Sequence, residues 1–296
     1  MKSALAEPEV AEVIVVDDAS TDDTVAAARA ADDDSGRLKI LTQPKNAGPS
    51  AARNRAMRES KSDWIGILDA DDFFLPGRMK RLLAYSDKAD FIADDAAQVA
   101  EDNIDGPRKN LLGASFEIPR PIGFAEFVLS NVTDAKRQRG ELGFIKPIMY
   151  RNFLTGKAIT YRENMRLGED YELYARALAQ GGRLMIVPEV GYISVVRPNS
   201  LSARHSESDL LQLRDNDEEL RRLPGLSTED QNALGKHYLS IDCRLQWRLL
   251  ILAVKKKNPA AALRTFIRPY PVPVYLANRL VEQLVIRTLR AFGRRA

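Results

Sequence analysis

Short apolar runs alternate with longer helix-forming stretches through the first 95 residues of the chain. Four strands are predicted at apolar runs, over residues 13–16, 38–41, 64–68 and 90–93. A helix is predicted after each of the first three runs. The first begins at Ser20 as N-cap and ends at about Ala31, the second covers residues 49–60 with Pro49 near its start, and the third begins at about Pro76. Strands separated by helices of this length are typical of βαβ units with a parallel sheet.

The remainder of the chain is less regular at first and then becomes helical. Glycine and proline mark loops between residues 96 and 145. Further elements are predicted as helices over 124–131 and after Gly168, and as strands over 144–150, 184–187 and 192–196. Beyond about residue 204 the pattern is helical and charged. We therefore divide the chain into an α/β domain over residues 1–205 and a helical extension over residues 206–296.

The start of the chain departs from the usual order of an α/β protein. Residues 1–5 have the composition of the end of a helix, and no apolar run precedes them. Because such sheets normally begin with a strand, we expect that a first strand is missing, with a misplaced start codon as the expected reason. A missing central strand would leave exposed ladder edges beside its former neighbours.

Composition limits the chemistry that the chain can carry. The 296 residues are 45% hydrophobic and 29% charged, as in an ordinary globular protein. One cysteine, Cys243, excludes an intrachain disulfide framework and indicates a reducing, cytoplasmic compartment. Two histidines, His205 and His237, are too few for a zinc cluster, so a metal would have oxygen ligands, which favours Mg²⁺ or Mn²⁺. No signal peptide and no apolar run of about 18 residues is present.

The net charge of +3 is distributed unevenly. Residues 255–296 contain ten basic residues and one acid, so this tail carries +9 and the rest of the chain −6. Apolar residues recur in it at helical spacing, with arginines near the other face, at Leu276, Ala277, Leu280, Val281, Leu284, Val285 and Leu289. A basic amphipathic helix is typical of an element on an anionic membrane surface. A helix packed on the α/β domain with solvated arginines is an equal alternative; nucleic-acid binding is less favoured, since no nucleic-acid module accompanies the charge.

Acidic residues follow the strand predicted over residues 64–68. Asp69, Asp71 and Asp72 come directly after this apolar run. Ligands of open α/β sheets bind beyond the carboxyl ends of the strands, and clustered carboxylates there are commonly bridged by a divalent cation. An acidic turn is the alternative, because aspartate also favours turns and caps. The segment alone leaves both interpretations open.

Four segments, in order, resemble the motifs of family 2 glycosyltransferases. They are Val15-Val16-Asp17-Asp18-Ala19-Ser20-Thr21-Asp22, Asn46-Ala47-Gly48-Pro49-Ser50-Ala51-Ala52-Arg53-Asn54, Leu68-Asp69-Ala70-Asp71-Asp72 and Gly168-Glu169-Asp170. More narrowly, the chain resembles the bacterial enzymes that add sugars to lipid-linked exopolysaccharide repeat units, including the succinoglycan glucosyltransferases. The resemblance covers about residues 1–205. It implies the α/β GT-A fold, Rossmann-like, with a mixed, mainly parallel sheet flanked by helices.

The resemblance also implies a nucleotide-sugar site. Asp17 would accept a hydrogen bond from the uracil ring, whereas Asp18 stays open between binding and helix capping. Asn46 and Arg53 would contact the nucleotide, Arg53 as a planar donor rather than an exposed surface residue. Residues after the last predicted strand would lie near the diphosphate, namely Arg197, Ser200 and Ser202, although such residues also suit an ordinary turn.

Metal binding and catalysis are assigned in the same way. By resemblance Asp71 binds the divalent ion, Mn²⁺ or Mg²⁺, that bridges the diphosphate, and Asp69 beside it contacts the ribose and completes the metal motif. Asp72 is either a reserve ligand or a helix cap. Asp170 would be the general base that deprotonates the acceptor, with Glu169 orienting it; an acidic helix cap is the alternative.

We therefore expect an inverting, metal-dependent hexosyltransferase that uses a nucleotide-diphosphate sugar, a UDP-hexose. Its acceptor would be a saccharide or a lipid-linked oligosaccharide, met in the cytoplasm or at the inner face of the cell membrane. The competing class is a non-catalytic glycosyltransferase-like scaffold or an inactive truncated fragment. A nucleic-acid binder led by the tail would instead show salt-sensitive DNA binding that survives loss of Asp71.

Overall fold

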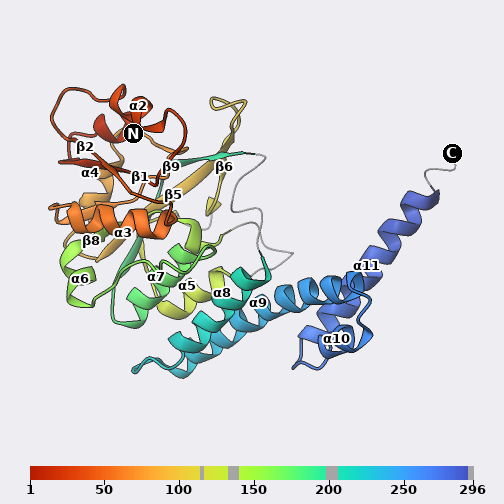
Figure 1. The fold of residues 1–296 in the computed structure, drawn as a ribbon. Helices are drawn as coiled ribbons and strands as arrows, with labels where there is room; N and C mark the ends of the chain where they lie inside the picture. Colours follow the sequence, from red (N-terminus) through yellow and green to blue (C-terminus); the bar gives the residue numbers. More distant parts are fainter. Residues whose placement is uncertain (114–116, 133–139, 198–205, 293–296) are drawn as a thin grey trace.

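The apolar runs form two sheets (Figure 1). The computed structural model describes residues 1–113, 117–132, 140–197 and 206–292. A two-stranded parallel sheet joins β1 (Val13–Asp17) and β2 (Leu38–Thr42). The second sheet has seven strands and follows the order β3 (Trp64–Gly66), β8 (Ile148–Tyr150), β5 (Phe91–Ala100), β9 (Leu184–Val196) and β4 (Phe73–Phe74). Two further strands complete it, β6 (Lys109–Asn110) on β5 and β7 (Arg120–Ile122) on β9.

The larger sheet is mixed, as predicted. Its parallel pair is β5 with β9, and its other described pairings, those of β3, β4, β6, β7 and β8, are antiparallel. Antiparallel pairing therefore has a larger share than the alternating pattern suggested, because the pattern indicates where strands lie along the chain but not which distant strands become neighbours, such as β3 and β8. The two strands predicted over 184–187 and 192–196 are one strand, whose register with β5 shifts around Asp95.

Helices pack against these sheets close to their predicted positions. The first half of the chain contains α1 (Lys2–Leu5), α2 (Thr24–Arg29), α3 (Pro49–Glu59) and α4 (Arg78–Leu83). The second half of the α/β part contains α5 (Phe124–Ser130), the 3₁₀-helix η2 (Leu142–Phe144), α6 (Arg151–Gly156) and α7 (Glu169–Ala179). The prediction of Ser20 as a helix cap is wrong. Its N–H donates to Asp17 Oδ1 at 3.1 Å in a turn, and α2 begins later, with Asp23 as N-cap residue.

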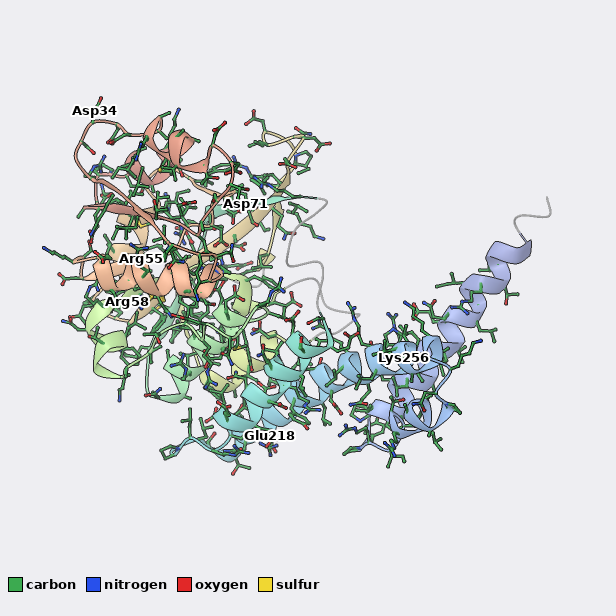
Figure 2. All side chains as sticks on the ribbon, in the orientation of Figure 1. Asp34, Arg55, Arg58, Asp71, Glu218 and Lys256 are labelled. Carbon is green, nitrogen blue, oxygen red and sulfur yellow. The ribbon has the colours of Figure 1, made fainter. Side chains whose placement is uncertain are left out.

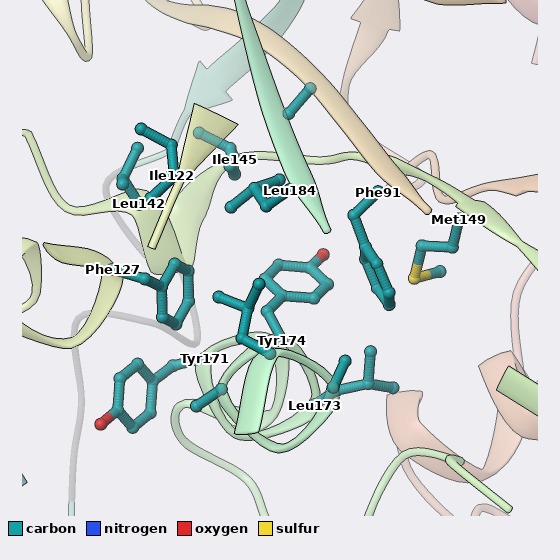
Figure 3. Packing of buried hydrophobic residues seen from close by; sticks show 14 of the residues in the cluster. Phe91, Ile122, Phe127, Leu142, Ile145, Met149, Tyr171, Leu173, Tyr174 and Leu184 are labelled. Atoms are coloured by element: carbon teal, nitrogen blue, oxygen red, sulfur yellow. The ribbon is translucent and has the colours of Figure 1, made fainter. Parts of the chain in front are cut away.

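Helix α7 crosses the main core (Figure 3). Phe127 stacks on Tyr171 with ring centroids 5.8 Å apart, and Phe91 meets Tyr174 edge-on at 6.2 Å. Leu173, between these tyrosines, is fully buried. Aromatic contacts of this kind add to the area that each ring buries. They fix the orientation of α7 and hence of the acidic residues in its first turn.

The helical extension contains α8 (Glu207–Leu220), α9 (Thr228–Lys255), α10 (Pro259–Arg264) and α11 (Val272–Phe292). The main core continues into α8 and α9 as far as Leu245. A buried network also joins them to α7, in which Asp217 accepts from Tyr171 Oη at 3.0 Å and lies 2.7 Å from His237 Nδ1. One core therefore spans the base of the extension and the α/β part. No helix of the described residues is long and apolar enough to cross a membrane.

A large hollow separates the two sheets. β1 pairs with β2 and β3 pairs with β8, and within the described part of the chain neither has a second neighbour. Both strands line one cavity of about 2490 Å³. The apolar residues 13–16 of β1 consequently remain only half-buried. Residues 2–5 form the expected helix, and the expectation of a missing first strand stays a prediction.

Candidate active site

The turn that follows β3 is tied to β9. The Asp72 N–H donates to the Asp69 carbonyl at 3.1 Å, and Tyr192 Oη accepts from the Asp69 N–H at 3.2 Å. Tyr192 Oη in turn donates to Asp72 Oδ2 at 2.7 Å, while the Val195 N–H donates to Asp72 Oδ1 at 2.9 Å. Both carboxylate oxygens of buried Asp72 are thus engaged by β9, and burial raises its pKa against the effect of these hydrogen bonds. Asp72 fixes the turn and does not cap the next helix.

Arg53, on α3, joins the two acidic motifs. Its Nη2 donates to Asp69 Oδ1 at 2.7 Å and its Nη1 to Glu169 Oε1 at 3.0 Å, with Asp170 Oδ1 at 3.7 Å. The guanidinium also lies 5.3 Å from the ring centroid of Tyr161. Its side chain is 14% exposed, so the alternative of a solvated surface arginine does not apply.

A second cation in the site, Lys146, was missed by the sequence analysis. Its Nζ lies 2.6 Å from Asp170 Oδ2 and 2.9 Å from Asp69 Oδ2. It precedes β8, and it is the only charged residue within the apolar segment predicted as a strand over 144–150. Because lysine is almost never buried without a partner, this position was the available signal.

The backbone of Lys146 is held by a buried ion pair. Arg78 binds Asp94 through Nε at 3.0 Å and Nη2 at 2.8 Å, and its Nη2 also donates to the Lys146 carbonyl at 2.5 Å. Both side chains are almost completely inaccessible to solvent. Gly191 makes room for them, since a Cβ there would lie 1.8 Å from Asp94 Oδ2. The position of Lys146 therefore depends on residues of α4, β5 and β9.

The charges of the site balance one another. Burial alone would raise the pKa of Asp69, but Lys146 and Arg53 hold it well below its usual range. Burial would lower the pKa of Lys146, but Asp170 and Asp69 raise it, so the ammonium stays charged at neutral pH. Asp170 Oδ2 is bound by Lys146, whereas Asp170 Oδ1 has no hydrogen-bond partner among the described residues. One oxygen of this carboxylate is thus fixed by Lys146, and the other is buried beside Arg53 Nη1, 3.7 Å away, without a hydrogen bond.

The entrance to α3 is shaped by Asp18. Its Oδ1 accepts from Gln43 Nε2 at 2.6 Å and from the Ala47 N–H at 2.8 Å, and its Oδ2 accepts from the Gly48 N–H at 2.7 Å. Gly48 has φ of +89°, a conformation that favours glycine, and it is followed by Pro49 at the first position of the helix. Asp18 therefore anchors the loop that leads into α3. It does not cap α2, the helix that follows Asp18 in the sequence.

The other predicted nucleotide-binding residues lie in different surroundings. Asn46 and Asp18 line the cavity, whereas Asp17 is buried at the end of β1 and is not among the lining residues. Arg197 directly follows β9, with its Nε 3.2 Å from Glu101 Oε1 and 3.6 Å from Asp71 Oδ2. Two further candidates lie outside the described residues, Ser200 and Ser202.

Asp71 is the acid of this turn that remains available to a metal. It is 37% exposed, while the oxygens of Asp69 are bound by Arg53 and Lys146. No cluster of three metal-ligating side chains occurs in the part of the chain that the structure describes. Mg²⁺ is commonly held by one or two carboxylates together with substrate phosphates, a requirement that Asp71 fits. Asp69 instead has a place in the ion-pair network, so its predicted part in metal binding lacks a free oxygen here.

One cavity collects most of the predicted residues. Asp71, which is labelled in Figure 2, is one of the residues that line it. The predicted residues that line it are Asp18, Asn46, Arg53, Asp69, Asp71, Glu169, Asp170 and Arg197, and Lys146 lines it too. The cavity thus combines an exposed carboxylate for a cation, arginines for phosphate or base contacts, and the carboxylate of Asp170, which Lys146 holds through one oxygen.

Comparison with known proteins shows which family the chain resembles. The family model "Glycosyl transferase family 2" matches residues 1–139. Succinoglycan biosynthesis protein ExoU of Rhizobium meliloti (strain 1021) is 47% identical over 251 residues, which are 83% of this chain and 71% of that protein. Succinoglycan biosynthesis protein ExoO of the same organism is 34% identical over 276 residues, 90% of this chain and 75% of that protein.

Solved structures share the fold at low identity. S. aureus TarS 1–349 in complex with UDP-GlcNAc has a TM-score of 0.60 at 18% identity, covering 88% of this chain and 84% of that one. Mannosyltransferase PcManGT from Pyrobaculum calidifontis, in complex with GDP-Man and Mn²⁺, has a TM-score of 0.57 at 17% identity, covering 95% and 74%. At these identities the likeness concerns the fold alone.

Proposed function

The chain belongs to glycosyl transferase family 2 and has the GT-A fold, both as predicted, and from this we propose the reaction that it catalyses. It transfers a hexose, with inversion, from a nucleotide-diphosphate sugar, a UDP-hexose, to a saccharide or lipid-linked oligosaccharide. The relatives named for succinoglycan biosynthesis support a role in exopolysaccharide or other cell-surface polysaccharide synthesis. A non-catalytic scaffold is the alternative.

The observation that carries the proposal is the state of Asp170. A general base must be ionised, fixed in direction and open on one oxygen toward the proton it accepts. Lys146 binds Oδ2 of Asp170, and Oδ1 has no hydrogen-bond partner among the described residues. This oxygen is buried beside Arg53, so the acceptor hydroxyl would supply the missing donor once the site has admitted it to Oδ1. As the hydroxyl oxygen attacks the anomeric carbon, its proton passes to Asp170 Oδ1 and the bond to the nucleoside diphosphate breaks.

Residues across the cavity bind the donor. Asp18 holds the loop of Asn46 against the donor side, where Asn46 would contact the nucleotide. A divalent cation, Mn²⁺ or Mg²⁺, held by Asp71 and the diphosphate oxygens, would neutralise the charge that develops on the leaving group. Arg197, beside Asp71, would bind a phosphate oxygen directly. Asp69 would accept from the ribose only after exchanging one of its present cation contacts.

The proposed acceptor determines where in the cell the enzyme would act. A lipid-linked oligosaccharide would be met at the cytoplasmic face of the cell membrane, which fits a protein with one buried, free cysteine. The enzyme would then act as a peripheral protein there. A free saccharide acceptor would require no such location.

Donor hydrolysis and transfer with Mn²⁺ test the proposal. Purified protein is incubated with UDP-glucose, UDP-GlcNAc or GDP-mannose, and the released nucleoside diphosphate is measured with and without Mn²⁺. We expect metal-dependent release from a UDP-sugar that falls at least about a hundredfold in Asp71→Ala. Asp32→Ala, which removes an exposed acid after α2, is the matched control and should leave the rate unchanged. No release from any donor, together with no calorimetric binding of UDP, would favour the scaffold.

A further inference from the structure

The C-terminal helices expose an apolar surface. Of the seventeen large apolar residues that are exposed in the described part of the chain, twelve lie between Ile251 and Leu289. They include the end of α9, the segment around α10 and most of α11. Apolar residues exposed singly are normal on a protein surface, but a contiguous patch marks an interaction site.

Helix α11 is apolar where it packs on α9 and also along the part that lies beyond this contact. Its inner face is fully buried through Val272 and Leu276, which pack with Cys243 and Leu250 of α9. Its outer side remains exposed by 44–66% at its large apolar residues, which are Val274, Leu280, Val281, Leu284, Val285 and Leu289. A helix that lies on a protein surface in water normally has a polar outer face. The packed-helix alternative therefore explains the inner face of α11 and leaves its outer face unexplained.

Basic residues accompany this surface. Between residues 251 and 289 there are seven lysines and arginines and one acid, Glu282, a net charge of +6. Three of the lysines, residues 255–257, are consecutive and exposed at the end of α9. Two copies of such a segment would repel each other, which argues against a second copy of this chain. Nucleic acid offers negative charge but no surface for valine and leucine side chains.

We propose that the outer face of α11, together with Leu263, Ile267 and the basic residues 255–257, binds to an anionic lipid membrane. An anionic bilayer combines phosphate groups for the lysines with an acyl boundary for the apolar side chains. Figure 1 shows α11 extending away from the sheets, and Figure 2 shows Lys256 far from Asp71, so this surface is separate from the catalytic cavity. The inference depends on the proposed function in one respect, the purpose of membrane binding, which would be to bring the catalytic cavity close to a lipid-linked acceptor.

Vesicle co-sedimentation of the full chain tests the inference. The probes are vesicles of phosphatidylglycerol and phosphatidylcholine (3:7) and vesicles of phosphatidylcholine alone, each at low and high salt. We expect binding to the anionic vesicles that weakens with salt. Val281→Ser/Leu284→Ser should lower the partition coefficient at least about a hundredfold, since two apolar side chains no longer enter the bilayer. Lys255→Gln/Lys256→Gln/Lys257→Gln should lower it about a hundredfold on anionic vesicles only.

Leu211→Ser replaces an exposed apolar residue of α8. This variant is the matched control and should bind like wild type. Absence of binding to anionic vesicles, or equal binding by the Val281→Ser/Leu284→Ser variant, would overturn the inference. So would a wild-type dimer, seen by light scattering, that this variant converts to a monomer. Donor hydrolysis without vesicles should be unchanged in the variant. A wild-type protein that binds vesicles but hydrolyses no donor would contradict the proposed function and leave the membrane surface established.

Discussion

Replacing Lys146 by methionine should destabilise the protein through the two carboxylates that it separates. The ammonium lies 2.6 Å from Asp170 and 2.9 Å from Asp69, in a position where its side chain is 9% exposed. Methionine has a similar length but no charge, so Arg53 alone would have to balance the acids. Removal of one partner of a buried ion pair costs about 3–5 kcal/mol of unfolding free energy. For a protein of this size that corresponds to a fall in Tm of about 5–8 °C.

Urea unfolding at pH 7 measures this loss, with Lys157→Met as the control. Lys157 is exposed after α6, so its replacement should change the unfolding free energy by less than about 0.5 kcal/mol. A double-mutant cycle with Asp170→Asn should give a coupling energy of about 1–3 kcal/mol, because the second change removes one of the unbalanced charges. A loss below about 1 kcal/mol, or no coupling, would refute the assignment of Lys146 as the central cation of the site.

The pH dependence of the same variant follows from the depressed pKa of Asp69. A carboxylate with a lowered folded-state pKa stabilises the protein above its unfolded pKa, and that contribution is lost as the pH falls through the folded value. Without Lys146 the pKa of Asp69 should rise toward its usual 3.8. The difference in unfolding free energy between wild type and Lys146→Met should therefore be largest near neutral pH and should decrease below about pH 4. Unfolding curves between pH 3 and 7 test this, and a gap that widens in acid would contradict it.

Two further changes test the supports of the site. Gly191→Ala should lower the unfolding free energy by at least about 3 kcal/mol, because its Cβ would displace Asp94 from the buried ion pair that holds Lys146. The control Gly235→Ala, in open space on α9, should be neutral or stabilising. Equal effects of the two changes in urea unfolding would contradict this description of the packing. Hydrogen bonds from residues 60–62 outweigh burial and lower the pKa of Glu12 from 4.5 to about 2, so its stabilising effect is complete above pH 4.5 and is lost as the pH falls toward 2. In Glu12→Gln the fall of Tm between pH 5 and 2 should be shallower, and an unchanged slope would be evidence against these hydrogen bonds.

Local patterns predicted the elements, and ordered motifs identified most of the residues that line the cavity. Residues 13–16, 38–41 and 49–60 were placed within one residue of β1, β2 and α3, since apolar runs and an N-terminal proline act locally. Arg53, Asp69 and Asp170 were identified from the family motifs, and the structure brings them into one ion-pair network.

Contacts between segments that are distant in the sequence could not be predicted from the pattern of apolar and polar residues. The partners of Asp72 on β9 are 120 and 123 residues away, so its choice between ligand and cap stayed open. Lys146 belongs to the site only because a loop before β8 lies beside α7. Periodicity placed Leu276, Leu280 and Leu284 on one apolar face of α11, but it did not show that only the start of this face packs on α9, because that is decided by the tertiary fold.

Asp170→Asn separates catalysis from binding. Asparagine keeps the shape of the side chain but cannot take up the proton of an acceptor hydroxyl. We expect binding of UDP with Mn²⁺, measured by calorimetry, to stay within about threefold of wild type, while turnover of the UDP-sugar falls by about 10²–10⁴-fold, the range for loss of a general base. Turnover within threefold of wild type, with the donor still bound, would contradict the role of Asp170 as the base.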